Sequence, residues 1–289
     1  MPASGPIEVV IDGSIATLVL RREHRRNAMT RSMVGTLIAA LDDVDLNDDV
    51  RAIVVTGAGT DFSAGADLSG GGRTFDEGSS EAGDGTYRDI GGLLALRLFA
   101  CAKPVIGAVN GAAAGIGATM TLPMDVRLAA TSARFVFPFV RRGIVPETCA
   151  SWFLPRVVGI SRAMEWVISG APVPALEALE AGLVRAVYEP DDLLPAAQEL
   201  ALRLTLHSSP VSVAAARQML WQGLTMAHPM LAHRQESALL RALGSGPDAV
   251  EGITAFLEHR SPEFTSRPSR DLRAFASWWE PPPFVEEGG

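Results

Sequence analysis

The segment KPVIGAVNGAAAGIGATMTLPMDV, Lys103–Val126, determines how this chain folds. From Pro104 to Met124 it carries no charged residue, and its length alone would span a bilayer. It also contains two prolines, an asparagine and four glycines, which are typical of turns. We therefore predict a buried strand, a turn and a helix here, and no membrane span.

The sequence on either side of this segment alternates between strand and helix patterns. Ile7–Leu20 alternates around an Asp-Gly pair and predicts a β-hairpin. Thr30 is a suitable N-cap for the amphipathic helix that follows it, and VRAIVVTGAG, residues 50–59, predicts a buried strand. From about Ser161 the patterns are mostly helical. This order predicts an α/β fold with parallel strands joined by helices and a helical C-terminal part.

Composition and charge exclude several functional classes. The chain has 289 residues and a net charge of −8, which argues against general nucleic-acid binding. Two cysteines without a CxxC pair, and an N-terminus without a signal-peptide pattern, favour a cytoplasmic location. A basic cluster, RREHRRNAMTR at residues 21–31, is either a local binding site for phosphates or a solvated turn.

Two glycine turns share one arrangement. SAGADL, residues 63–68, and GAAAGIG, residues 111–117, each lie between a strand and a helix. Small residues there allow a ligand to approach the backbone, and free N–H groups at a helix start favour an anion. Two such turns suggest a pair of donors converging on one oxygen, as in an oxyanion hole. The alternative is two purely structural turns.

Glu147 is an isolated carboxylate in an apolar stretch, RRGIVPETCASWFLP at residues 141–155. Its neighbours include Ile144, Val145, Trp152 and Phe153. Such a carboxylate is either exposed on a loop or held in an apolar pocket, where desolvation raises its pKa and suits it to act as a base.

Several stretches of the chain, taken in order, resemble one family. They are DFSAGADL, KPVIGAVNGAAAGIGATM, DVRLAATSARFVFPFVRRGIVPE, SWFLPRVVG, EALEAGLVRAV and AFLEHRSPEF. Together they resemble the crotonase family, the enoyl-CoA hydratase/isomerase superfamily, from about Ile7 to Phe264. The resemblance implies a spiral of ββα units and an acyl-CoA thioester as substrate. It does not select one reaction, because this scaffold carries several chemistries.

The resemblance also implies roles for particular residues. The N–H groups of Ala66 and Ile116 match the pair that polarises the thioester carbonyl, although Ile116 stands where relatives usually have glycine. Positions assigned to CoA binding are Arg25, Arg26, Ala64, Asp67, Leu68, His259 and Arg260. Of these, His259 and Arg260 match residues that often reach CoA from a neighbouring subunit. Asp67 also suits a helix cap.

The acid–base residues separate the possible reactions. Hydratases of this family use two glutamates, and the matching positions here hold Thr119 and Phe139, which we assign to the acyl pocket. The pattern P-F-x-x-x-G-x-x-x-E, from Pro138 to Glu147, instead resembles isomerases that keep a single carboxylate. One carboxylate can remove a proton from C2 and return it to C4. We therefore predict a double-bond isomerase with Glu147 as acid and base.

Alternatives remain open. Glu147 could instead activate water in a hydratase or a thioester hydrolase, or the chain could bind CoA with little turnover. No metal and no cofactor beyond the CoA of the substrate is expected. The resemblance implies a homotrimer or a dimer of trimers. It divides the chain into a catalytic core at residues 1–205, trimerisation helices at 206–264 and a tail at 265–289 that contains several prolines and tryptophans.

Overall fold

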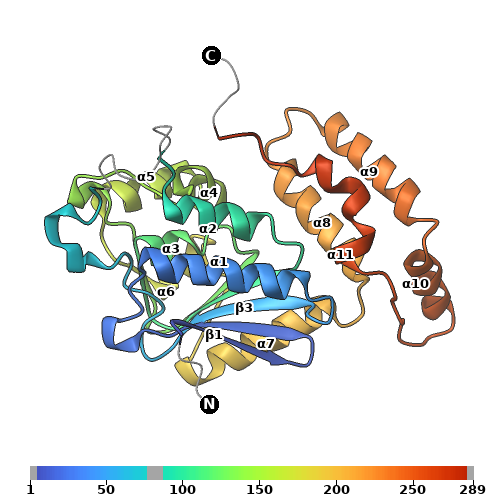
Figure 1. Cartoon of the computed structure of the whole chain (residues 1–289), viewed down its shortest axis with the longest axis horizontal. Helices are drawn as coiled ribbons and strands as arrows, with labels where there is room; N and C mark the ends of the chain where they lie inside the picture. The colour runs from blue at the N-terminus through green and yellow to red at the C-terminus, as the bar shows by residue number, and fades with distance from the viewer. Residues whose placement is uncertain (1–4, 77–86, 285–289) are drawn as a thin grey trace.

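The structure is a computed structural model, which describes residues 5–76 and 87–284. Its main sheet has the strand order β1-β2-β3-β4-β6-β9 (Figure 1). Strands β1 and β2 pair antiparallel, as the hairpin pattern predicts, and the following pairs in this sheet are parallel. A smaller sheet has the order β5-β7-β8. The predicted α/β class is therefore confirmed.

The strands are short, and β2, β3, β4 and β6 of the main sheet are the mostly buried ones. In the main sheet they are β1 (Ile7–Asp12), β2 (Ile15–Leu20), β3 (Ala52–Gly57), β4 (Val105–Val109), β6 (Val126–Ala130) and β9 (Ala186–Tyr188). In the smaller sheet they are β5 (Ala112–Ala114), β7 (Arg134–Val136) and β8 (Val173–Pro174). Every residue of β3 and β4 is buried, because helices cover both faces of these parallel strands.

The helices form two groups. In the core they are α1 (Arg31–Leu46), α2 (Ile90–Phe99), α3 (Ile116–Thr119), α4 (Ala150–Val158), α5 (Ile160–Ser169), α6 (Ala175–Glu180) and α7 (Pro190–Thr205). Beyond them are α8 (Pro210–Gly223), α9 (Pro229–Leu243), α10 (Pro247–Leu257) and α11 (Pro268–Asp271). Figure 1 shows α8 to α11 lying together beside the core. Residues 285–289 of the predicted tail lie outside the described residues.

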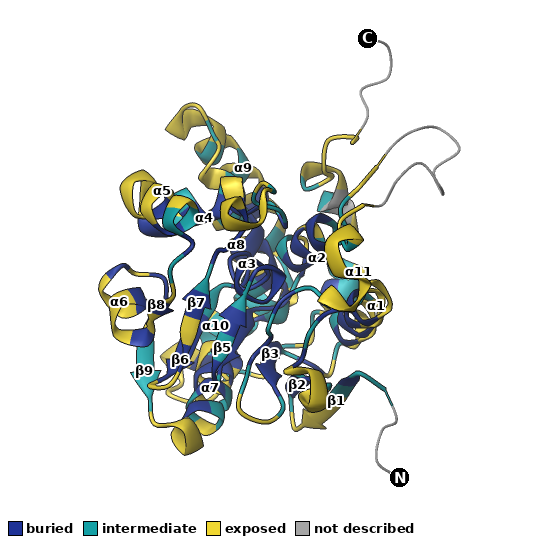
Figure 2. Ribbon diagram, turned by 90° about the vertical axis from the view of Figure 1, so that its left-hand side faces the viewer, coloured by how far each residue is buried: buried dark blue, intermediate teal, exposed yellow. Residues whose placement is uncertain are grey.

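The two faces of the main sheet bury separate apolar clusters. Alternate residues of β2 and β3, such as Leu18 and Val55, pack with α1 and α2. The residues that alternate with them, such as Ile15 and Val54, pack against α7. Thr30 caps α1 as predicted, because its hydroxyl accepts a hydrogen bond of 3.1 Å from the Met33 N–H. Figure 2 shows the contrast between the buried strand β3 and the largely exposed helix α9.

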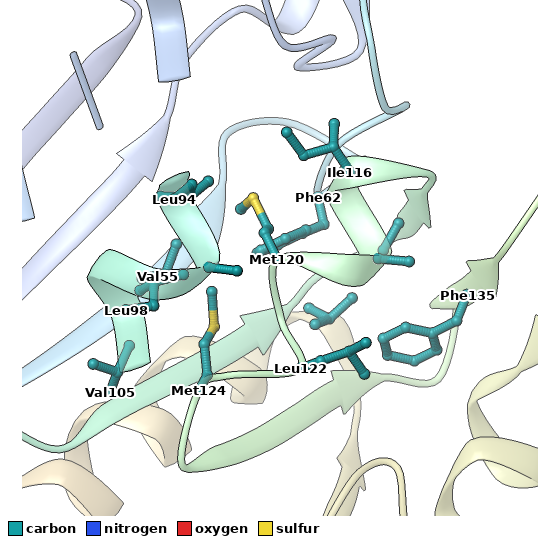
Figure 3. Packing of buried hydrophobic residues seen from close by; sticks show 14 of the residues in the cluster. Val55, Phe62, Leu94, Leu98, Val105, Ile116, Met120, Leu122, Met124 and Phe135 are labelled. Carbon is teal, nitrogen blue, oxygen red and sulfur yellow. The ribbon is translucent and has the colours of Figure 1, made fainter. Parts of the chain in front are cut away.

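The charge-free segment folds differently from its prediction in one respect. Its strand is β4, but the expected helix is reduced to the four residues of α3, preceded by the short strand β5. The chain after α3 makes successive turns as far as Met124. Figure 3 shows Met120, Leu122 and Met124 pointing into the core from these turns, so burial is preserved without a long helix.

Arg217 joins the C-terminal helices to the core. Its guanidinium donates to the Asp125 carboxylate at 2.8 Å and to the backbone carbonyls of Leu98 at 2.9 Å and Phe99 at 2.8 Å. These carbonyls lie at the C-terminal end of α2, where orphan acceptors need partners. Asp125 also accepts hydrogen bonds from the Val105 N–H and from the indole of Trp221. The pair therefore fixes α8 against α2 and β4.

Candidate active site

A cavity of about 550 Å³ lies between the start of α1, the two glycine turns and the segment that leads to α4. Its lining is mainly apolar and includes Val34, Ile90 and Ile144. Five of the predicted site residues also line it, namely Ala66, Asp67, Ile116, Phe139 and Glu147, so the structure brings them together. A concave, largely apolar pocket with few polar groups is the usual form of a small-molecule site.

Two backbone donors reach this cavity from different turns. Ala66 pairs with Met29 as an isolated bridge whose hydrogen bonds use the Gly65 carbonyl and the Asp67 N–H, which leaves the Ala66 N–H free. Ile116 is the first residue of α3, so its N–H has no partner within the helix. Within the described part of the chain, neither N–H donates a hydrogen bond. Both are therefore available to an oxygen bound in the cavity.

Residue 65, which precedes the Ala66 donor, must be glycine because of its backbone conformation and its close contact with the second turn. Its φ is +96°, and a β-carbon there would overlap the backbone carbonyl of Ala114. The two turns therefore touch through backbone alone. Ile116 keeps its side chain in the core, where it is 7% exposed, and Figure 3 shows it beside Phe62 and Met120. A branched side chain is thus accommodated at the position where the family resemblance implies glycine.

Glu147 is held by two hydroxyl groups. The Thr119 hydroxyl lies 2.9 Å from Oε1 of Glu147, and the Thr148 hydroxyl contacts Oε2. Burial raises the pKa of Glu147 above its ordinary value, and the nearby negative charge of Asp89 adds to the rise, while the two hydroxyl bonds oppose it. Glu147 therefore has the environment of a base that binds a proton more readily than an exposed glutamate does.

The backbone that carries Glu147 is strained. Thr148 and Cys149 adopt φ values of +59° and +54°, and both are left-handed although neither is glycine. For a β-branched residue such as Thr148 this conformation is rare and costs about 1–2 kcal/mol. It turns the chain sharply into α4 and returns the Thr148 hydroxyl to the carboxylate of the preceding residue. Strain of this kind is concentrated at functional sites.

The N-terminus of α2 lies against the same carboxylate. A β-carbon on Gly91 would overlap Oε2 of Glu147 and the Thr148 hydroxyl, and it would lie 3.2 Å from Oδ1 of Asp89. Asp89 is the N-cap of α2, because Oδ1 accepts a hydrogen bond of 2.5 Å from the Gly92 N–H. Asp89, Gly91 and Glu147 all line the cavity. Two carboxylates from separate segments therefore meet at this helix start.

The two positions that hold glutamates in hydratases of the resembled family are filled differently. Thr119 is fully buried, and its hydroxyl contacts both Glu147 and the Gly115 carbonyl. Its single proton can satisfy only one of these acceptors at a time. Phe139 is 3% exposed and contributes an apolar wall to the cavity. Thr119 thus holds the Glu147 carboxylate through a hydrogen bond, and Phe139 lines the cavity with an aromatic ring.

The residues predicted to bind CoA fall into two regions. Ala64, Asp67 and Leu68 lie in the first glycine turn, and the Ala64 N–H donates to the Arg26 carbonyl, so this turn is adjacent to the basic cluster. The Arg26 guanidinium is paired with Asp61 at 2.8 Å, and the Arg25 side chain is exposed.

Asp67 accepts a hydrogen bond from the Ser69 N–H and pairs with Arg22 at 2.7 Å. These contacts lower the pKa of Asp67 to about 2, chiefly through the Ser69 N–H. The carboxylate serves as the predicted cap.

His259 and Arg260 are not brought to this cavity within one chain. They follow α10, which Figure 1 places with the outer helices, away from α3. Arg260 pairs there with Glu251 at 2.6 Å and with Glu258 at 2.8 Å. The structure therefore does not bring these two residues together with the other predicted site residues.

Sequence reasoning missed Asp89, Gly91 and Thr148. The pattern Asp89-Ile-Gly-Gly-Leu is a recognisable N-cap followed by apolar helix residues, but nothing local connects it to Glu147, more than fifty residues later. Nothing in the sequence indicated a role for Thr148, because β-branched residues rarely adopt positive φ.

Among the described residues no group of acidic, histidine or cysteine side chains could hold a metal ion. In the same residues no helix is long and apolar enough to cross a membrane.

Comparison with known proteins assigns this arrangement to a family. Residues 10–267 match the family model for enoyl-CoA hydratase/isomerase. The chain is similar to an enoyl-CoA hydratase of Alternaria alternata, with 42% identity over 86% of this chain and 82% of the relative. It is also similar to the 1,2-epoxyphenylacetyl-CoA isomerase of Escherichia coli, with 34% identity over 89% and 97%.

A solved structure shows the same fold. An enoyl-CoA hydratase subunit from Geobacillus kaustophilus superposes with a TM-score of 0.81 and 30% identity, covering 90% of this chain and 98% of that one. The similarity spans both the cavity and the C-terminal helices, because it extends over nearly the whole chain.

Proposed function

The chain belongs to the enoyl-CoA hydratase/isomerase family, and on that premise we propose that it moves a double bond in an enoyl-CoA. The observation that supports this proposal is the single hydroxyl-bound carboxylate, Glu147, in a cavity that also contains the free N–H groups of Ala66 and Ile116. No cofactor besides the CoA of the substrate is required by this chemistry.

The mechanism follows from these groups. The thioester oxygen of a 3-enoyl-CoA accepts hydrogen bonds from the Ala66 and Ile116 N–H groups. Glu147 removes a proton from C2, and the electron pair moves into a dienolate whose oxygen the two donors stabilise. The same carboxyl then delivers the proton to C4, which leaves the conjugated 2-enoyl-CoA. Its raised pKa suits both steps, because it must first accept and then release a proton.

Hydration is the second candidate reaction. It is favoured by the Alternaria alternata relative, which is named an enoyl-CoA hydratase. The side chains of Thr119 and Phe139 argue against hydration, because neither can activate water or protonate carbon in the manner of a carboxyl group. We therefore expect isomerisation to be faster than hydration.

Product analysis tests the proposal. The purified protein is given a 3-enoyl-CoA and, separately, the matching 2-enoyl-CoA, and products are separated by chromatography. We expect rapid formation of 2-enoyl-CoA from the first and slow formation of 3-hydroxyacyl-CoA from the second. Fast hydration without any double-bond migration would contradict the proposal.

The substitution Glu147→Gln tests whether Glu147 is the acid–base group of the proposed isomerisation. Glutamine keeps the shape of the side chain and can still bond to both threonines, but it is not a base. We expect isomerisation turnover to fall by roughly 10²–10⁴-fold with little change in CoA binding. Glu165→Gln, on the exposed side of α5, is the control. Turnover of Glu147→Gln within a few-fold of the parent would exclude this assignment.

A further inference from the structure

Besides Asp67, which is paired with Arg22, the cavity is lined by another carboxylate that the proposed isomerisation does not use. Asp89 lines the cavity together with Glu147, and both approach the same point above Gly91. One oxygen of Asp89, Oδ1, accepts the Gly92 N–H. Among the described residues no hydrogen bond reaches its other oxygen, Oδ2. A carboxylate has about four acceptor positions, so Asp89 retains capacity for a water molecule while it caps α2.

The two carboxylates have different surroundings. Glu147 is bound by two hydroxyl groups and sits between α3, α4 and the start of α2, and its pKa is raised. Asp89 accepts a backbone N–H at the N-terminus of α2 through one oxygen only. Two carboxyl groups that face one cavity from different segments can divide the roles of acid and base between them.

We propose that Asp89 is a second acid–base group of this site, which together with Glu147 allows slow addition of water to a conjugated enoyl-CoA. This inference rests on the function proposed above, because it uses the same cavity and the same pair of N–H donors. Asp89 thereby supplies, from the start of α2, a carboxylate that positions 119 and 139 lack.

The step balances without any further reactant. Asp89 takes a proton from water while the water oxygen bonds to C3. The π electrons of the C2–C3 bond move toward the thioester oxygen, where Ala66 and Ile116 hold the enolate. Protonated Glu147 then delivers its proton to C2, which gives the 3-hydroxyacyl-CoA. The proton on Asp89 returns to Glu147 through solvent.

Asp89→Asn separates this role from capping. Asparagine is as good an N-cap as aspartate, so α2 is retained, but it cannot take a proton from water. The assay measures hydration of trans-2-hexenoyl-CoA and isomerisation of trans-3-hexenoyl-CoA by the full chain. We expect hydration to fall by roughly 10²-fold or more, and the ratio of hydration to isomerisation to fall at least tenfold.

The pH dependence supplies a second readout. The titratable or charged groups that line the cavity or face Glu147 are Arg31, Asp67, Tyr87, Asp89, Arg142 and Cys149. Removing the negative charge of Asp89 lowers the pKa of Glu147. The limb of the isomerisation pH profile that reports Glu147 should therefore move to lower pH in Asp89→Asn. This movement records the charge of Asp89 beside Glu147, and the change in the ratio of hydration to isomerisation is the readout that a residue acting only as a helix cap would not produce.

The control is Asp248→Asn. Asp248 also accepts backbone N–H hydrogen bonds, from Thr265 and Ser266 at 3.1 Å each, but among the outer helices. Its substitution should leave the ratio and the pH profile as they are in the parent. Asp89→Ser, which also caps a helix, replaces Asp89→Asn if that variant does not fold.

The outcomes distinguish the two proposals. If the parent isomerises but shows no hydration above the background rate, Asp89 has no such role and the proposed isomerase function remains. The same conclusion follows if Asp89→Asn keeps the parental ratio of hydration to isomerisation, even when its pH profile moves. If the parent catalyses neither reaction, both proposals are wrong.

Discussion

At the scale of single residues, burial of the Glu147 carboxylate makes folding less favourable and makes this residue a stronger base. It is mostly removed from water, and among the described residues its hydrogen bonds come from the hydroxyls of Thr119 and Thr148. Hydroxyls stabilise a carboxylate less than an ion pair does. The strained backbone at Thr148 keeps this arrangement in place although it is unfavourable locally.

The free energy of unfolding should record this cost as a function of pH. The pKa of Glu147 is higher in the folded chain than its ordinary value of 4.5. Below about that pH both folded and unfolded chains are protonated at this residue, and there is no penalty. As pH rises, the unfolded chain ionises first, so the parent loses stability until the folded carboxyl also ionises.

Glu147→Gln lacks this penalty. We expect its stability gain over the parent to be larger at pH 8 than at pH 4, as measured by urea unfolding at both pH values. Glu165→Gln, whose side chain is exposed, should show no such difference. A gain for Glu147→Gln that is equal at the two pH values would contradict the expectation.

At the scale of elements, the start of α2 is shaped by its neighbour rather than by helix propensity. Gly91 lies inside a helix, where glycine is about 1 kcal/mol less favourable than alanine. The contacts of its missing β-carbon, with Glu147 and Thr148, explain why glycine is needed. The first turn of α2 thus leaves room for the side chains of Glu147 and Thr148, which come from another segment.

Gly91→Ala and Gly35→Ala should therefore have opposite effects. Gly35 lies on the exposed side of α1, and a β-carbon there would meet no atom within 4 Å. Gly35→Ala should raise stability by up to about 1 kcal/mol without changing turnover. Gly91→Ala should lower both stability and turnover, because the methyl group displaces the Glu147 carboxylate. Thermal unfolding and the isomerase assay test both, and a more stable, fully active Gly91→Ala would show that the contact is unimportant.

Local elements were predictable from the sequence, and contacts between elements were not. The cap at Thr30 and the buried strands β3 and β4 follow from residue type and short-range pattern. The proximity of Ala66 and Ile116 came from a family resemblance and not from spacing. The approach of Asp89 to Glu147 depends on how α2 packs over the turns near α3, and the sequence carries no local record of that packing.

At the scale of the whole molecule, the outer helices expose more apolar surface than a single chain needs. Leu240, Ile253, Phe256 and Leu257 are each between 64% and 77% exposed, on or near α9 and α10. An apolar cavity of about 1020 Å³ lies between α8 and the helices that follow it. Surfaces of this kind mark interaction sites. This surface is a candidate for the contact between copies in the homotrimer or dimer of trimers that we predict.

Charged substitutions on this surface should lower the molecular mass in solution. We expect the double variant Leu240→Glu, Phe256→Glu to shift toward the monomer mass of 30.6 kDa in light scattering after gel filtration, with a higher KM for acyl-CoA. Leu46→Glu is the control, because Leu46 is 70% exposed at the end of α1. An unchanged mass would place the assembly interface elsewhere.

The contacts of Arg217 limit how the C-terminal helices can be exchanged between related chains. This guanidinium completes the C-terminal end of α2, while the opposite end of α2 supports Glu147 and Asp89. Helix α2 thus connects the two regions: its N-terminal end lies beside Glu147, and its C-terminal end is bound by Arg217 from α8. Those helices therefore cannot be exchanged between relatives as a modular cassette unless the incoming one supplies an equivalent arginine. A protein engineer who grafts a new assembly surface onto this core should carry α8 over intact.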